Sequence, residues 1–200
     1  MELYLLSCLL LGSALWTVCQ ALGDEDGAIV QNIEEKIWSE NGVPSDILQE
    51  GSEEVVVWAT SEFPSDTVLS STTTRKNSDG KWELVFNSVA SNGDENAATV
   101  RLAEEDAPGS VVLTETKRHL LYLFDSKKDG ISANYQWIEN GEGKSEFGIV
   151  KINPENYNSE KLCGAVELFE KSGLKINRER KFAIGRGDNG ELKYLNLQCN

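Results

Sequence analysis

Alternating apolar and polar residues recur in short segments along the middle of the chain and predict β-strands. From Trp82 to Phe86, apolar side chains occupy every second position, and the same period of two recurs from Ala98 to Leu102. Other segments are rich in β-branched and aromatic residues, which favour extended structure. These further predicted strands are residues 53–60, 67–74, 111–116, 119–124, 132–138 and 146–152. Asn, Asp, Gly and Pro residues separate the strands, so we expect turns between antiparallel neighbours.

This strand order restricts the fold class. A parallel sheet needs a long crossover, usually a helix, between successive strands, and no helical pattern occurs between them. About eight short strands with turn residues between them are typical of a β-sandwich or an up-and-down barrel. Two further apolar segments, residues 181–184 and 192–197, are expected to return to the sheet near the end of the chain.

Two segments outside the strands have the period of amphipathic helices. Three isoleucines at intervals of four residues predict a short helix within residues 24–41: Ile29, Ile33 and Ile37. Near the C-terminus, an apolar stripe predicts a second helix within residues 158–173: Leu162, Val166 and Phe169. Asn158 or Ser159 is suited to cap the start of this second helix, and Gly173 to end it.

The first 23 residues have the composition of a secretory signal peptide. Residues 3–18 are apolar and uncharged, and Ala21 and Gly23 place small side chains before Asp24, as a cleavage site requires. A membrane anchor is the alternative, but the apolar stretch is shorter than the roughly 20 residues that span a bilayer. We therefore divide the chain into a signal peptide, residues 1–23, and one ligand-binding domain, residues 24–200, and expect a secreted protein.

Removal of the signal peptide would take Cys8 and Cys19 with it and leave two cysteines. Cys163 lies in the predicted C-terminal helix, and Cys199 is the penultimate residue. A single pair of cysteines in an oxidising compartment predicts one disulfide bond. This bond would hold the helix against the C-terminal tail.

The charge balance argues against polyanionic partners. The chain has 19 Lys and Arg against 33 Asp and Glu, and loss of Glu2 leaves 19 minus 32, or −13. An acidic surface repels phosphate backbones and anionic lipid, so we expect no nucleic-acid partner and no membrane binding. It attracts cations, including small amines, although solubility alone is a simpler explanation of the charge.

Catalytic and metal-binding motifs are not found in the sequence. His119 is the single histidine, no G-x-S-x-G motif occurs, and no His/Cys cluster has zinc spacing. Residues 125–130 resemble the start of a calcium loop, but Lys127 stands where an oxygen ligand is needed. We therefore expect a protein that is not an enzyme and that needs no metal or cofactor.

The interior of a closed barrel is the remaining candidate site. About eight strands enclose just enough space for one small ligand. Five aromatic residues on the predicted strands are candidates to line it: Trp58, Trp82, Tyr122, Tyr135 and Trp137. Three carboxylates are candidates to hold an ammonium group: Glu62, Asp66 and Glu146. Core packing is the alternative role for the aromatic residues, and solvent exposure for the acids.

The order of these features resembles the tick salivary lipocalins of the histamine-binding-protein family. The resemblance covers nearly all of the mature chain and rests on several short segments in sequence: Lys36-Ile37-Trp38, the strand at 55–60, Glu146-Phe147, the helix around Cys163, Phe182–Arg186 and Cys199. It implies an all-β fold with short helices. The expected architecture is an eight-stranded antiparallel up-and-down lipocalin barrel with a short N-terminal helix and a C-terminal flanking helix, secreted and monomeric.

The resemblance also implies a function. Members sequester histamine, a related biogenic amine or a lipid mediator, and so suppress host inflammation. Glu146 matches an acidic pocket position, but Gly148 stands where a tryptophan is expected and Val100 where an acid is expected. These departures leave room for a lipid mediator, fatty acid or sterol in the same barrel. A protein-binding immune modulator that acts through its outer surface is the other alternative.

Overall fold

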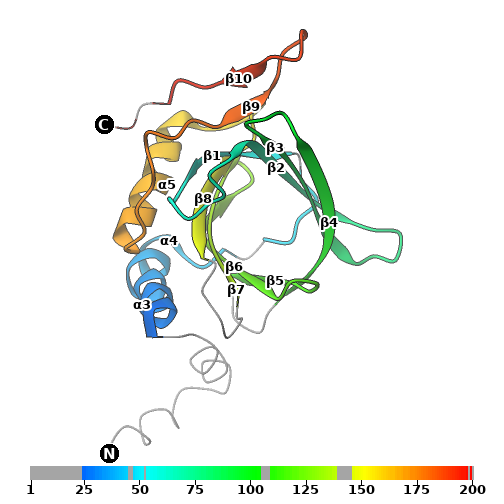
Figure 1. Cartoon of the computed structure of the whole chain (residues 1–200). Coiled ribbons are helices and arrows are strands. Elements are labelled where there is room, and N and C mark those ends of the chain that lie inside the picture. The colour runs from blue at the N-terminus through cyan, green and yellow to red at the C-terminus, as the bar shows by residue number, and fades with distance from the viewer. Residues whose placement is uncertain are drawn as a thin grey trace, which may run out of the picture.

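Eight antiparallel strands form a closed barrel in which each strand pairs with its sequence neighbours and β8 closes onto β1 (Figure 1). The computed structural model describes residues 24–44, 47–51, 53–104, 109–138, 146–197 and 199; the predicted signal peptide lies outside them. The strands are β1 (Glu54–Ala59), β2 (Thr67–Lys76), β3 (Trp82–Ala90), β4 (Glu95–Glu104), β5 (Ser110–Leu113), β6 (Arg118–Ser126), β7 (Ile131–Ile138) and β8 (Phe147–Ile152). The predicted up-and-down barrel is confirmed, and the sandwich is excluded.

Both predicted helices lie side by side on one flank of the barrel (Figure 1). The N-terminal one is a continuous run of α3 (Asp24–Asn32), the wider π-helix η1 (Ile33–Trp38) and α4 (Ser39–Asn41). The C-terminal one is α5 (Ser159–Lys171), and the side chain of Asn158 caps it by accepting hydrogen bonds from two backbone amides of its first turn. Among the described residues, no helix is long and apolar enough to cross a membrane.

The last two strands do not join the barrel, contrary to expectation. β9 (Ala183–Arg186) and β10 (Leu192–Tyr194) pair only with each other in a separate two-stranded sheet. The physical reason is that β8 already pairs with β1, so the closed barrel has no free edge to receive them. β9 instead lies beside β1 and β2, above the barrel in the view of Figure 1.

The register of β8 shows which face of the sheet points inward. Gly148 lies opposite Tyr135 of β7, and a side chain at Gly148 would meet the Phe169 ring of α5, with Cβ only 2.2 Å from a ring carbon. This face is therefore the outside, covered by α5. The alternate β8 residues, Phe147, Ile149 and Lys151, point into the barrel. The tryptophan expected at position 148 would not fit, because the helix packs directly on that backbone.

Two of the three hydrophobic clusters in the described part of the chain lie on opposite sides of the sheet. The larger one is outside the barrel, where Ile33, Ile37 and the apolar face of α5 pack against β6, β7 and β8. The smaller one is inside and contains residues of β3, β5 and β6. Ile47, which precedes β1, belongs to this inner cluster and fills part of the barrel from one end. The inside is therefore partly occupied by the chain itself.

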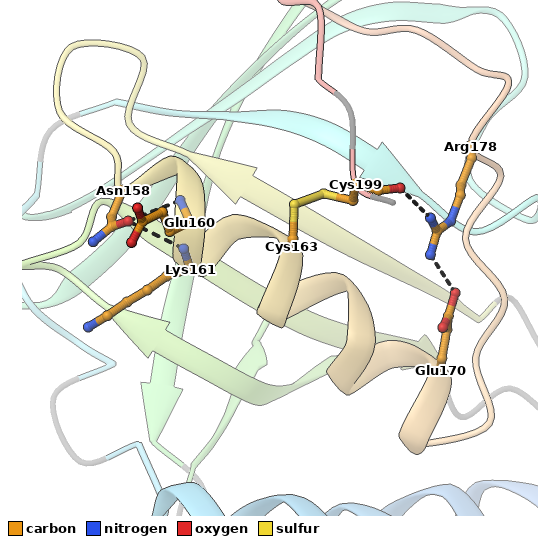
Figure 2. The surroundings of a disulfide bond; sticks show 7 residues. All are labelled: Asn158, Glu160, Lys161, Cys163, Glu170, Arg178 and Cys199. Atoms are coloured by element: carbon orange, nitrogen blue, oxygen red, sulfur yellow. Dashed lines mark hydrogen bonds and ion pairs between the residues drawn. A yellow bond between two sulfur atoms is a disulfide. The ribbon is translucent and has the colours of Figure 1, made fainter.

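The predicted disulfide between Cys163 and Cys199 is confirmed and links α5 to the C-terminal tail (Figure 2). Arg178 lies beside it and donates hydrogen bonds to the carbonyl oxygen of Cys199 at 3.1 Å and to Glu170 at 2.7 Å. Residues 172–199, which we call the C-terminal arm, are thus fastened to the helix at both of these points.

Candidate functional site

The barrel has two distinct ends. At one end, which we call the base, Gly51 donates a backbone hydrogen bond to Thr74 and the Glu50 carboxylate accepts one from Lys76, so that residues 47–51 run across the end of β2. The opposite end, which we call the mouth, contains the β1–β2 loop at residues 60–66 and the first residues of β6 and β8.

Polar residues lie along the inner face of β6 and β7, from Arg118 at the mouth to Asn134 near the middle of β7. The guanidinium of Arg118 lies over the ring of Phe147, 4.8 Å from its centre. Gln136 is the cross-strand partner of Phe147 and donates a hydrogen bond of 2.9 Å to Asn134. The Asn134 Nδ2 atom is buried, and no acceptor within the described part of the chain reaches it. Burial lowers the pKa of Arg118, although this group stays protonated at any physiological pH.

The wall formed by β3 and β4 is less filled than the opposite one. Register places Trp82, Phe86, Val100 and Leu102 on the inner face, yet each is only half-buried. Inner-face residues of β7 and β8 are, in contrast, largely buried. A pocket of about 400 Å³ is lined by Trp82 and Leu102, together with residues of the outer rim. Apolar surface on this wall is therefore available to a ligand.

Buried charges occupy the inner face at the base. Lys151, whose side chain is 4% exposed, lies 2.8 Å from Glu54, and Lys127 lies 3.3 Å from the other oxygen of Glu54. Ser132 donates a further hydrogen bond to Glu54 at 3.2 Å. Burial alone would raise the pKa of Glu54, but the two ammonium groups outweigh it and lower that pKa to about 2. Glu54 is therefore a carboxylate already paired within the chain.

Asp125 is the less well paired acid of this group. Its side chain is 4% exposed, Lys127 lies 3.5 Å away, and neither carboxylate oxygen has a hydrogen-bond donor within the described residues. Burial raises the pKa of Asp125 to about 6, since Lys127 only partly offsets it and Glu54 adds to it. A pocket of about 380 Å³ lies beside Asp125 and Lys127, between residues 41–44 and the β6–β7 turn.

The predicted aromatic residues divide between the two faces. Tyr122 and Trp82 lie on the inner face, as a ligand site requires. Trp58, Tyr135 and Trp137 lie on the outer face, in the cluster under the helices. Trp58 is placed there by a register shift between Val56 and Trp58, and the other two by the pairing of β7 with Gly148. Our expectation that these three line the cavity does not match their positions.

The predicted acids do not lie on the inner face together. Glu62 and Asp66 are exposed in the β1–β2 loop, and Glu62 accepts a hydrogen bond from the neighbouring Ser61. The Glu146 carboxylate accepts a 2.5 Å hydrogen bond from the hydroxyl of Tyr135, whose ring packs outside the barrel. Contact of any of these residues with a ligand stays a prediction. Within the described residues, no three potential metal ligands gather into a site.

Comparison with known proteins supports the fold but not a narrower relationship. No family model and no curated protein matches the chain. The siderocalin Ex-FABP, described as functioning through dual ligand specificities, superposes with a TM-score of 0.51 at 7% identity, covering 66% of this chain and 87% of its own. The major allergen Per a 4 from cockroaches gives 0.53 at 7% identity, covering 67% and 88%. The chain thus has the lipocalin-type barrel fold, and membership of the tick salivary group stays a prediction.

Proposed function

We propose that this protein is a secreted, monomeric, non-enzymatic carrier of a small amphipathic molecule, which it holds inside the barrel. The apolar part of the ligand would lie along Trp82, Phe86 and Leu102, and its oxygen-bearing end would meet Arg118. The observation that carries this proposal is the guanidinium of Arg118, which lies over the inward-facing Phe147 at the mouth, together with the buried, unbonded amide nitrogen of Asn134 further along the same inner face. A fatty acid or a carboxylate lipid mediator has the required chemistry.

The hydrogen-bonding groups on this inner face favour a ligand that carries acceptor atoms. A guanidinium only donates, and the Nδ2 group of an asparagine also only donates. The buried Nδ2 donor of Asn134 is costly while nothing accepts from it, so a ligand oxygen that reaches it is stabilised, and a carboxylate also pairs with the charge of Arg118. An ammonium group would add donors and positive charge beside Arg118. From the sequence we expected a biogenic amine first and a lipid mediator second. For a ligand bound at the mouth, this geometry supports the lipid mediator first.

Substitution of Arg118 by glutamine should weaken binding of a fluorescent fatty acid such as dansylaminoundecanoic acid by about tenfold or more. The reason is that a charge-assisted hydrogen bond contributes about 1.5 to 3 kcal/mol in a desolvated site. Fluorescence titration at two salt concentrations measures the dissociation constant. Arg75→Gln is the matched control, because Arg75 is an exposed residue that pairs with Glu83.

Comparison with the corresponding fatty alcohol separates the contribution of the ligand's carboxylate to binding from that of its apolar chain. The alcohol should bind the unmodified protein more weakly than the acid, and Arg118→Gln should change its affinity by less than about threefold. Equal affinity of Arg118→Gln and the unmodified protein for the acid would contradict the proposed role of Arg118. No binding of either probe would contradict carriage of this class of ligand.

A biogenic amine such as histamine is a second candidate, and Asp125 is the observation that favours it. An ammonium group desolvated inside a protein needs a carboxylate partner. Asp125 is a buried carboxylate without a hydrogen-bond donor among the described residues, whereas Glu54 is held by two lysines. Capture of histamine by this group would serve the suppression of host inflammation that the resemblance to tick proteins implies.

Calorimetric titration with histamine tests this second candidate. We expect Asp125→Asn to weaken binding about tenfold or more, and Glu146→Gln to leave it unchanged. Affinity of the unmodified protein should fall as the pH drops below about 6, because protonation of Asp125 removes its charge. Loss of binding in Glu146→Gln alone would restore the site expected from the sequence. No heat with histamine would contradict the amine candidate.

A further inference from the structure

The β1–β2 loop, residues 60–66, folds against the mouth of the barrel through a single aromatic residue. Phe63 is only 7% exposed although it lies in a loop. Its ring meets the inward-facing Phe147 edge to face, with 5.2 Å between the ring centres. On its other side it meets Phe182 of the C-terminal arm, at 5.6 Å and again edge to face. Phe63 therefore links the C-terminal arm to Phe147, whose ring lies under the guanidinium of Arg118.

Arg180 of the C-terminal arm holds this loop from outside. Its guanidinium donates hydrogen bonds to the carbonyl oxygens of Phe63 and Thr67, each at 2.8 Å, and also to that of Pro64. It lies over the rings of Phe182 at 4.6 Å and Phe63 at 5.4 Å. The planar fork of an arginine can satisfy several carbonyls at once, which a lysine cannot. One side chain thus holds the middle of the loop and the residue that follows it.

The arm that carries Arg180 is itself anchored to the barrel and to α5. Asn177 donates a backbone hydrogen bond to Ala59 at the end of β1, and its side chain accepts from the backbone amides of Glu179 and Arg180. Arg178 and the disulfide tie the same arm to α5. Arg180 is therefore presented from a fixed support, while the loop that it holds is exposed apart from Thr60 and Phe63.

We propose that residues 60–66 form a lid over the mouth and that Arg180 is the latch that keeps this lid closed. A molecule that moves between solvent and Arg118 must displace Phe63 from Phe147, and this requires release of the hydrogen bonds from Arg180. Arg180 then sets the rate of ligand entry and exit without contacting the ligand. The role in ligand exchange rests on the proposed carriage of a small molecule, whereas the latch itself does not.

Two measurements on Arg180→Gln test the latch, with Lys181→Gln, which removes an exposed positive charge from the neighbouring position, as the matched control on the same arm. In stopped-flow mixing with the fluorescent fatty acid, Arg180→Gln should accelerate association and dissociation at least about fivefold each. Its dissociation constant should change less than about threefold, because a latch affects the barrier more than the bound state. Lys181→Gln should leave both rates unchanged. Unchanged rates in Arg180→Gln would overturn the proposal.

Hydrogen exchange of the ligand-free protein decides the question even if no fatty acid binds. Amides of residues 61–67 should exchange at least about tenfold faster in Arg180→Gln, while those of β6 and β7 should keep their protection. Equal acceleration throughout the barrel would overturn the latch and assign Arg180 a general stabilising role, and unchanged exchange would also overturn it. Should Arg180→Gln fail to fold, Arg180→Lys replaces it as the test variant. Lysine keeps the positive charge but loses the planar guanidinium, so we expect a smaller acceleration of exchange at the same amides.

Discussion

Replacement of Lys151 by methionine should destabilise the protein by about 3 to 5 kcal/mol, as expected when one partner of a buried ion pair is removed. Lys151 is buried inside the barrel, 2.8 Å from Glu54 and 3.0 Å from the hydroxyl of Thr72. Methionine fills a similar volume but leaves the Glu54 carboxylate with Lys127 as its remaining cation among the described residues. Urea denaturation at neutral pH, followed by fluorescence, measures the loss of unfolding free energy.

Two control variants separate the effect of an unpaired charge from the effect of altered packing. The double variant Glu54→Gln/Lys151→Met removes both charges and should recover most of the lost stability, since no unpaired charge remains buried. Lys171→Met breaks the ion pair with Glu40, in which the two side chains are 46% and 60% exposed, and should cost less than about 1 kcal/mol. A Lys151→Met variant as stable as Lys171→Met would contradict the assigned role of Lys151.

The same cluster predicts the pH dependence of stability. The pKa of Glu54 is lower in the folded protein than its ordinary value of 4.5, so its contribution is present above that pH and is lost as the pH falls toward 2. The pKa of Asp125 is raised from 3.8 to about 6, so its burial costs stability above pH 6 and this cost disappears as the pH falls toward 4. These two groups together favour maximal stability near pH 4 to 5.

Strand positions could be predicted from the sequence because turn residues and local periodicity are local signals. β3 is typical: apolar side chains at Trp82, Leu84 and Phe86 mark one face, and the Asn77–Gly80 turn precedes it. The disulfide could be predicted because Cys163 and Cys199 are the two cysteines beyond the predicted signal peptide. Closure into a barrel came from the resemblance, since strand spacing alone fits a sandwich equally well.

The sequence could not show which face of each strand points into the barrel. For this reason, three aromatic residues were predicted on the wrong face. In β7 every residue from Ile131 to Trp137 is buried, because α5 covers the outer face and the barrel interior the other. The polar residues Ser132, Asn134 and Gln136 therefore face inward, and the aromatic ones face outward. A half-exposed strand would have the reverse arrangement. In β1, the shift between Val56 and Trp58 moves Trp58 to the outside, and sequence periodicity does not reveal such a bulge.

The charged residues inside the barrel were missed for a related reason. A charged residue on a strand normally marks the solvent face, so the sequence did not indicate that Arg118, Asp125 and Lys151 point into the barrel. Lys151 did carry a usable signal, because it stands in the otherwise apolar segment Phe147–Ile152. A single charge in such a strand indicates a buried partner, which here is Glu54, 97 residues earlier in the chain. Only the fold identifies that partner.

Replacement of both Cys163 and Cys199 by serine should destabilise the protein by about 3 to 4 kcal/mol, because the bond closes a loop across a sequence separation of 36 residues. In the chain-entropy model, most of this loss arises from greater freedom of the unfolded chain. Urea denaturation measures the difference. Dithiothreitol should lower the stability of the unmodified protein to that of the double variant and leave the variant itself unchanged.

The double variant also tests whether the disulfide supports the lid. Without it, the arm keeps the hydrogen bond from Arg178 to Glu170 and the packing of Leu195 and Leu197 against the outer core. If the covalent bond is the main anchor, exchange of amides 61–67 should accelerate in the variant as it does in Arg180→Gln. Unchanged exchange would assign the anchoring to those noncovalent contacts. A stability loss below about 1 kcal/mol would contradict the chain-entropy estimate, because a closed loop of this length should restrict the unfolded chain strongly.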